Sequence, residues 1–392
     1  MEPFRPYMGE MVKELTVKLN IKASIEPEFR FDSLYEQVCS SEVLWMALKH
    51  VARRKTKPGI DGFRVEKLKE KATAQNFLAE IEDELKLGVY TPSPLKRSYI
   101  KERGKERCLG IPTLKDRTVQ TACRIILSAI FEADFHACSY GYREKKSAHN
   151  AIARAKRTLE RGYTNVYVVD IEKFFDNISH DIIMDKLEKR IADPKILTLI
   201  QRWLAVPWED EDITRTKGTP QGGAISPLLA NIVLNEVDQK WYDTEGPSKQ
   251  YSASMIRYAD DIIIMTKEYK PEVIEAISRG MERLELNLNP NKSKSITLCP
   301  TKQLHYLGYT FALMSPSGEV RAKVILSPQE EKVITFEREL RSLKSEITRT
   351  KNIKRRDRLE KKIMDKVRGY SNYYCLSTHN PLLSLISSTV NR

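Results

Sequence analysis

The chain has 392 residues, enough for two or three packed regions, and an ordinary hydrophobic fraction of 41%. Its formal net charge of +13 (66 Lys and Arg against 53 Asp and Glu) favours a polyanionic partner, nucleic acid before membrane. Six scattered cysteines without a Cys-x-x-Cys pair, and six histidines without a cluster, argue against a zinc site and indicate a reduced, intracellular protein.

Neither secretion nor membrane insertion is predicted. Charged residues such as Glu10 and Lys13 interrupt the N-terminal segment, so it lacks the apolar core of a secretory signal. Residues 218–235 carry no formal charge, but Gly, Pro, Gln, Ser and Asn interrupt them, so they do not predict a membrane span. We therefore expect a cytoplasmic protein without a membrane partner.

The first 165 residues predict mainly helices around one basic hairpin. Apolar residues recur at helical spacing over residues 34–48 and again over 77–87. Two strand-like runs flank a charged turn within residues 98–112, which predicts a hairpin. Residues 117–131 predict a largely buried helix, and residues 147–159 predict another, with its N-cap at the first of them.

The middle of the chain predicts strands that end at acidic residues. Val166–Val169 is an apolar strand that runs directly into Asp170. Residues 255–265 form two apolar runs on either side of Asp260-Asp261, which predicts a strand, a tight turn and a returning strand. Helices are predicted to begin near Ser179 and at Ser226, the latter an N-cap followed by proline.

The C-terminal part predicts two strands and then basic helices. The strands cover residues 304–311 and 323–326, and helical sequence follows from residue 327. Between Arg341 and Arg368 there are 12 Lys or Arg and four acids, so this segment holds +8 (12 − 4) of the net charge. Such a run commonly marks a solvated helix face, but the excess has one sign, so we predict contact with nucleic acid.

Asp260 and Asp261 suggest a site for divalent cations. Two unit charges about 4 Å apart repel by roughly 4 kcal/mol at an effective dielectric near 20, and a cation removes that cost. Phosphoryl transfer by two metal ions needs carboxylates on neighbouring strands, and Asp170 at a strand end supplies a third. The alternatives are a hairpin turn that faces water and, for Asp170, a helix N-cap.

Three motifs in order resemble a known family. They are Asp170-Ile171-Glu172-Lys173-Phe174-Phe175-Asp176, Gly218-Thr219-Pro220-Gln221-Gly222-Gly223 and Tyr258-Ala259-Asp260-Asp261. Together with Leu109-Gly110-Ile111-Pro112, Tyr306-Leu307-Gly308-Tyr309 and Arg368-Gly369-Tyr370-Ser371-Asn372-Tyr373-Tyr374, they resemble reverse transcriptases of the group II intron type, over residues 34–376. The resemblance implies an α+β, right-hand polymerase fold with fingers, an antiparallel-sheet palm and a helical thumb.

The resemblance also implies where each part lies. The N-terminal extension and fingers are expected in residues 1–165, the palm in 166–311, and a basic thumb with a short maturase-like segment in 312–392. The metal ligands for two Mg²⁺ ions, with Mn²⁺ an alternative, are expected to be Asp170, Asp260, Asp261 and the carbonyl of Ile171. Lys292 matches the lysine that would protonate the leaving pyrophosphate, although Lys294 is an equal candidate by its chemistry.

Further residues are implied to contact the substrates. Lys101 and Arg107 of the hairpin would grip the dNTP triphosphate, Phe175 would exclude a 2′-hydroxyl, and Gln221 with Gly222 would hold the nucleotide and template. The primer grip would be Tyr306, Leu307, Gly308 and Tyr309, and the basic residues expected on nucleic acid are Arg349, Lys351, Lys354, Arg355, Arg356 and Arg358. Two histidines, His149 and His180, are expected to be structural.

The expected activity is RNA-directed DNA synthesis from a primer 3′-hydroxyl, with an RNA template, a DNA or RNA primer and dNTPs as partners. A structured intron RNA or another non-coding RNA is a further expected partner. Residues 368–374 resemble the family's maturase segment, and we call them the maturase-like string. No Cys/His-containing nuclease follows this string, so endonuclease activity is not expected. Two alternatives stay open: a stand-alone polymerase that serves antiphage defence or repair, and an RNA-binding splicing cofactor whose polymerase site is idle.

Overall fold

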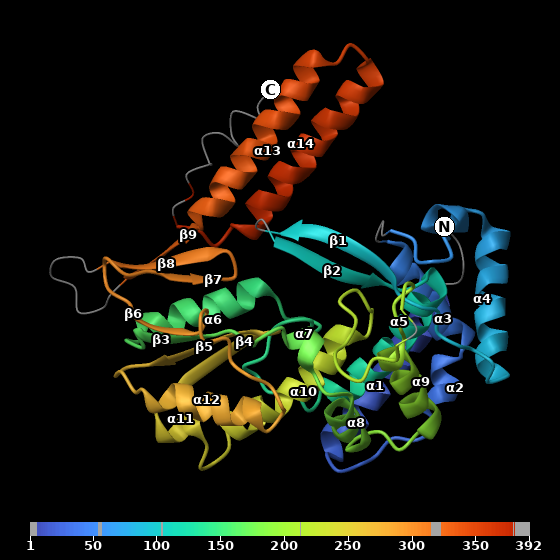
Figure 1. Ribbon diagram of the computed structural model, residues 1–392, viewed down its shortest axis with the longest axis horizontal. Coiled ribbons are helices and arrows are strands. Elements are labelled where there is room, and N and C mark those ends of the chain that lie inside the picture. Colours follow the sequence, from blue (N-terminus) through green and yellow to red (C-terminus); the bar gives the residue numbers. More distant parts are fainter. Residues whose placement is uncertain are drawn as a thin grey trace. The chain divides into compact units, whose positions relative to one another are not determined.

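The computed structural model describes residues 6–53, 57–102, 105–211, 213–314, 323–378 and 380. The chain forms two compact units. Figure 1 shows the ribbon, coloured along the sequence. The first unit comprises Met1–Tyr142, Ile171–Trp241 and Ile277–Leu288, and the second comprises Arg143–Asp170, Tyr242–Ala276 and Asn289–Arg392. Helices and antiparallel sheets occur together, which confirms the α+β class. The division into fingers, palm and thumb stays a prediction.

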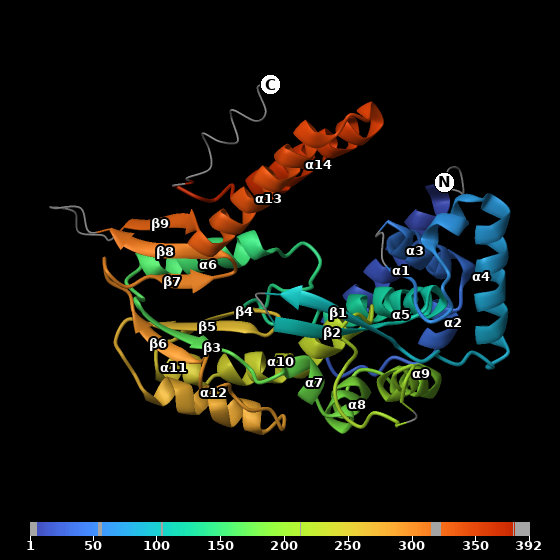
Figure 2. The ribbon, with the colours of Figure 1, turned by 45° about the horizontal axis from the view of Figure 1, so that its top comes forward.

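The first unit is mainly helical. Its elements are α1 (Pro6–Ile25), α2 (Leu34–Val38), α3 (Ser41–Ala52), the 3₁₀ helix η1 (Val65–Lys69), α4 (Lys71–Lys86), β1 (Lys96–Glu102), β2 (Lys105–Ile111), α5 (Leu114–Phe131), α7 (Phe174–Asn177), α8 (His180–Glu188), α9 (Pro194–Ala205) and α10 (Ser226–Trp241). Helix α5 packs against α1 and α3, beside which it lies in Figure 2. Its residues Val119, Ile126 and Ile130 are fully buried, as its apolar sequence predicts.

The expected hairpin forms from β1 and β2. The two strands pair in antiparallel register from Lys96↔Ile111 to Glu102↔Lys105. Helix α4 begins at Lys71, six residues before the predicted start, because the polar first turn carries no apolar signal. Ser226 is the first helical residue of α10 and not its N-cap, since its hydroxyl donates to the carbonyl of Pro220 at 2.8 Å.

The second unit contains two antiparallel sheets. Its strands are β3 (Asn165–Val169), β4 (Ser254–Tyr258), β5 (Asp261–Thr266), β6 (Lys294–Thr297), β7 (Leu304–Tyr306), β8 (Tyr309–Met314) and β9 (Lys323–Pro328), ordered β4-β5-β3-β6 and β7-β8-β9. Helix α6 (Ala148–Glu160) contacts β4 of the first sheet and β9 of the second, and it lies between the sheets in Figures 1 and 2. Ser147 caps this helix as predicted, accepting from the Asn150 N–H.

Two long helices follow the second sheet. They are α13 (Glu330–Arg349) and α14 (Ile353–Tyr373), which pack side by side as a hairpin in Figure 1. Each contributes an apolar stripe at helical spacing, and the rings of Phe336 and Tyr370 stack at 4.2 Å between them. The remaining helices are the short α11 (Pro247–Gln250) and α12 (Glu272–Glu282). No helix in the described part of the chain is long and apolar enough to span a bilayer.

Candidate active site

The two adjacent aspartates lie at the turn between β4 and β5. Tyr258 pairs with Asp261 across the turn, so only Ala259 and Asp260 remain in the loop. Ala259 has a left-handed φ of 57°, a conformation that costs a non-glycine residue about 1 kcal/mol. Buried strands on both sides maintain this strain, and they present the half-buried Asp260 and the exposed Asp261 at the sheet edge.

Asp170 reaches the same edge from the neighbouring strand. β3 and β5 pair in antiparallel register up to Val169↔Ile262. Asp170 follows Val169 and Asp261 precedes Ile262, so the two aspartates are next in register, where facing Cβ atoms lie about 5 Å apart. Asp170 does not cap the helix that follows, because the N-cap of α7 is Lys173. The alternative interpretation of Asp170 as an N-cap is therefore wrong.

A short turn holds Lys292 against Asp170. The backbone N–H of Asn289 donates to the carbonyl of Asp170 at 2.8 Å, and the Ser293 hydroxyl accepts from the Asp170 N–H at 3.1 Å. The Lys292 ammonium then lies 3.1 and 3.2 Å from the two carboxylate oxygens of Asp170. Lys294, the rival by chemistry, lies in β6 opposite Val168. Lys292 is therefore the lysine that contacts the acidic site.

The donor set suits a hard divalent cation. Carboxylate oxygens are the ligands that Mg²⁺ prefers. The register brings two carboxylates, those of Asp170 and Asp261, to the same end of the paired strands β3 and β5. The ion pair with Lys292 shows that the Asp170 carboxylate accepts a cation at this place. The described residues contain no ready-made group of three His, Cys, Asp or Glu side chains around a metal position. The aspartates thus have the chemistry that a magnesium ion needs, but their side chains would have to move closer together to bind it.

The first unit brings a second set of predicted residues together. The Gln221 amide lies 3.3 Å from the Asp176 carboxylate, and the carbonyl of neighbouring Phe175 accepts from the Thr219 N–H at 2.7 Å. The Gln221 carbonyl in turn accepts from the Gly110 N–H of β2 at 3.0 Å. One loop therefore lies against both the half-buried Phe175 and the hairpin strand.

Gly222 is needed for this close approach. Its φ is +132°, and a Cβ built on it would lie 2.4 Å from the carbonyl oxygen of Gly110. No side chain fits at that distance, so only glycine lets the loop touch the hairpin.

Three other predicted site residues are placed by their backbones. The side chains of Lys101 and Arg107 lie outside the described residues; their backbones pair with Glu106 and Ile100, respectively. Ile171 forms an antiparallel bridge with Leu288.

The predicted primer grip is a tight turn between β7 and β8. Tyr306 pairs with Tyr309, and the two loop residues, Leu307 and Gly308, both have positive φ, 46° and 76°. This pattern is typical of a type I′ hairpin turn. The Tyr306 hydroxyl donates to the Asp261 carbonyl at 3.4 Å, which connects this strand to the aspartate turn.

Tyr373, which the sequence did not single out, holds this turn from helix α14. Its hydroxyl donates to the Leu307 carbonyl at 2.7 Å. Burial raises the pKa of Tyr373 to about 12, and the nearby Tyr374, Tyr258 and negatively charged Asp261 add to the rise. The maturase-like string was the available signal, but which of its tyrosines faces the turn depends on how α14 packs.

A known protein family matches the part of the chain that contains the three aspartates and Lys292. Residues 95–311 match the family model described as reverse transcriptase (RNA-dependent DNA polymerase). The chain belongs to the reverse transcriptase family. It is 34% identical over 324 residues to Protein YkfC of Escherichia coli K12, a match that covers 72% of this chain and 84% of YkfC.

The names of two further relatives refer to introns. Identity with the group II intron-encoded protein LtrA of Lactococcus lactis is 34% over 275 residues, 65% of this chain and 41% of LtrA. The putative COX1/OXI3 intron 1 protein of Saccharomyces cerevisiae is 28% identical over 291 residues, 60% of this chain and 34% of that protein. The resemblance to group II intron reverse transcriptases is therefore confirmed, while the chain spans less than half the length of these two relatives.

The six basic residues predicted to contact nucleic acid lie where α13 meets α14. Arg349 ends α13, Lys351 lies in the connection, and four more basic residues lie in the first turns of α14. All six are exposed. Arg355 pairs with Glu346 at 2.5 Å and Arg356 with Glu360 at 3.4 Å. We call this set, Arg349, Lys351, Lys354, Arg355, Arg356 and Arg358, the basic tip.

Both motif histidines contact backbone carbonyls. His149 Nε2 lies 2.7 Å from the Tyr373 carbonyl, and His180 Nε2 lies 2.8 Å from the Gly218 carbonyl. Burial lowers the pKa of His180, and its Nε2–H donates to the Gly218 carbonyl, which can only accept. These contacts agree with the structural roles predicted for them.

Proposed function

We propose that this chain is an RNA-directed DNA polymerase that extends a primer 3′-hydroxyl with dNTPs on an RNA template. The observation that carries the proposal is the arrangement at one end of the paired strands β3 and β5. There Asp170 and Asp261 are next in register, and the Lys292 ammonium forms an ion pair with Asp170. Acidic groups on neighbouring strands with an adjacent proton donor are what nucleotidyl transfer requires. Membership of the reverse transcriptase family supports the same chemistry.

Asp170, Asp260, Asp261 and the Ile171 carbonyl would hold two Mg²⁺ ions. When bound, such ions activate the attacking hydroxyl and neutralise the phosphates in displacement reactions of this class. The protein's own contribution is positional. The strained Ala259 turn presents two acids, and the turn around Asn289 and Ser293 fixes the backbone of the third.

Lys292 is proposed to have two roles at this edge. Without substrate its ammonium neutralises the Asp170 carboxylate, which lowers the repulsion among the acids. With substrate bound, the same ammonium is placed to donate a proton to the leaving pyrophosphate, since a lysine is a competent general acid. Its side chain is 61% exposed, so it moves between these positions without crossing a packed core.

Residues of the first unit are proposed to bind the dNTP and the template. Phe175 would exclude a ribose 2′-hydroxyl, and Gln221 with Gly222 would hold the nucleotide and template backbone. Their support is the shared loop, which contacts both Asp176 and β2. Lys101 and Arg107 are proposed to grip the triphosphate, because guanidinium and ammonium groups bind phosphate oxygens strongly.

The RNA partner is proposed to be an intron RNA or one derived from it. LtrA is by name a group II intron-encoded protein, and the exposed basic tip offers a surface for RNA phosphates. A stand-alone role in defence or repair is the alternative, and a splicing cofactor is another. If the chain is a splicing cofactor, Asp260→Ala should leave splicing unchanged, because RNA binding does not need this carboxylate.

Primer extension by the full chain tests the polymerase proposal. The purified protein is given an annealed DNA primer on an RNA template with Mg²⁺ and dNTPs. We expect extension by the wild-type chain and by Asp365→Ala, an exposed acid of α14, and loss of extension in Asp260→Ala. Absence of extension by the wild type, or equal extension by both variants, would overturn the proposal.

A further inference from the structure

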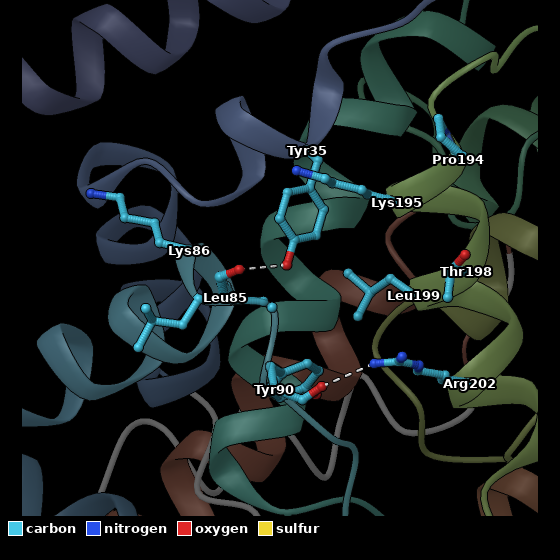
Figure 3. A pocket seen from close by; sticks show the side chains of 11 residues that line it. Tyr35, Leu85, Lys86, Tyr90, Pro194, Lys195, Thr198, Leu199 and Arg202 are labelled. Atoms are coloured by element: carbon cyan, nitrogen blue, oxygen red, sulfur yellow. Dashed lines mark hydrogen bonds between the residues drawn. The ribbon is translucent and has the colours of Figure 1, made fainter.

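A groove in the first unit lies between α4 and α9, with α2 at its base (Figure 3). Its volume is about 440 Å³, within the range of small-molecule sites. Helix α9 contributes Lys195, Thr198 and Arg202, spaced i, i+3 and i+7 and therefore on one face. We call it the α4–α9 groove.

The groove is positively charged. The residues that line it include Lys86, Lys195 and Arg202 and no carboxylate. Lys86 is already paired with Glu82 at 2.6 Å. Lys195 and Arg202 are exposed and have no carboxylate partner within the part of the chain that the structure describes. Arg202 uses one donor, from Nη1 to the Tyr90 carbonyl at 3.3 Å, so most of its guanidinium donors are available.

The base of the groove is apolar and ordered. Leu85 and Leu199 are buried, and the Tyr35 hydroxyl donates to the Leu85 carbonyl at 2.8 Å, as the dashed line in Figure 3 shows. This bond fixes the tyrosine ring in the groove, and the Lys195 ammonium lies 5.4 Å from the ring centroid. At the rim, Leu87 is 76% exposed, an apolar side chain with no cover from the described residues.

We propose that the α4–α9 groove binds one phosphorylated nucleoside, with the phosphate between Lys195 and Arg202 and the base against Tyr35 and Leu87. Cations beside a fixed aromatic ring and an exposed leucine match a ligand that is anionic at one end and flat and apolar at the other. The nucleotide is either free or an unpaired residue of an RNA strand, since both have this chemistry. No residue of the aspartate site lines the groove, so nucleotide binding there does not require polymerisation.

Charge-matched variants of the full chain test the groove. Lys195→Gln/Arg202→Gln removes the two groove cations that have no carboxylate partner among the described residues. Lys49→Gln/Lys189→Gln removes two exposed lysines elsewhere in the first unit and keeps the same net charge. Binding of adenosine monophosphate is measured by calorimetry. Binding of a fluorescent ten-nucleotide single-stranded RNA is measured by anisotropy at fixed salt. Unfolding temperatures of both variants check that the exposed substitutions leave the fold intact.

We expect the groove variant to lose about tenfold or more in affinity and the control to lose less than twofold. If the groove variant loses affinity for adenosine monophosphate, the ligand is a free nucleotide. If it loses affinity for the RNA but not for the monophosphate, the ligand is an RNA strand. Crosslinks from 5-bromouridine RNA should then map to the peptide that contains Tyr35. Equal affinities of both variants for both ligands would overturn the proposal. Competition by poly-glutamate as effective as by RNA would overturn it too, in favour of an acidic protein segment.

Discussion

The Tyr373 hydroxyl donates a hydrogen bond to the Leu307 carbonyl at 2.7 Å, joining the end of α14 to the turn between β7 and β8. Leu307 adopts φ 46°, which a leucine takes up only when its surroundings hold it there. Next to it, a Cβ on Gly308 would lie 3.2 Å from the Tyr374 hydroxyl, so the helix packs directly on the turn. The geometry of the proposed primer grip thus depends on the C-terminal helix.

Tyr373→Phe should weaken primer binding more than it slows chemistry. Loss of one hydrogen bond of about 1 kcal/mol predicts roughly a fivefold rise in KM for the primer–template, with kcat changed less than twofold. Tyr370→Phe is the matched control on the same helix, because the buried Tyr370 hydroxyl has no hydrogen-bond partner among the described residues. Steady-state extension kinetics measure both constants. Equal effects of the two variants would contradict the positioning role.

Lys292→Met should separate cation binding from catalysis. Without the ammonium, Asp170 has no protein cation at 3.1 Å, so we expect tighter Mn²⁺ binding, measured by electron paramagnetic resonance. Nucleotide addition should nevertheless slow by about 10²-fold if the ammonium is the general acid. Lys294→Met, two residues away and exposed in β6, serves as the control and should change neither quantity. A similar slowing in Lys294→Met would reassign the proton donor.

Gly222→Ala should disrupt the contact between its loop and β2. The added Cβ would lie 2.4 Å from the Gly110 carbonyl oxygen, and φ +132° is open almost only to glycine. Because the shifted loop carries Gln221, we expect KM for dNTPs to rise by about tenfold or more. Gly9→Ala in α1 meets nothing within 4 Å and should stabilise the fold by up to about 1 kcal/mol. Unchanged dNTP kinetics in Gly222→Ala would refute the proposed role of the loop.

Glu236→Gln should lower stability at neutral pH but not in acid. Burial alone would raise the pKa of Glu236, but hydrogen bonds and charges from Lys186 and Lys240 outweigh it and lower the pKa to about 2. A carboxylate whose pKa is lower in the folded state stabilises the fold at pH values above its unfolded pKa of about 4.3. This stabilisation disappears as the pH falls towards 2. We expect a difference of about 1–2 kcal/mol at pH 7, after allowance for solvent screening. Urea unfolding at several pH values measures it; a difference that persists at pH 2 would contradict the assignment.

Neutralising part of the basic tip should reduce the salt dependence of RNA binding. Arg349→Gln/Lys351→Gln/Lys354→Gln removes up to three phosphate contacts, and each contact contributes about 0.7–0.9 to the slope of log affinity against log salt. We therefore expect the slope to fall by about 2 and the unfolding temperature to stay unchanged, since all three side chains are exposed. An unaltered slope would show that RNA binds elsewhere.

Local sequence patterns predicted the elements that carry the acids. The apolar run Val166–Val169 predicted β3, and the paired runs around Asp260 predicted the β4–β5 hairpin, because side-chain alternation and turn residues are local properties. The basic character of residues 341–368 was equally visible. The family resemblance, carried by the order of short motifs, then indicated the chemistry that joins them.

Tertiary structure decided which of these residues meet. The β3–β5 register brings Asp170 level with Asp261, and the turn at Asn289 selects Lys292 over Lys294 for contact with Asp170. Tyr373 and the α4–α9 groove had no distinct signal, because both depend on residues far apart in the chain that only packing brings together. Residue type and spacing thus determined which chemical groups the chain carries, because both are local properties, whereas long-range strand pairing and helix packing decided which of these groups meet.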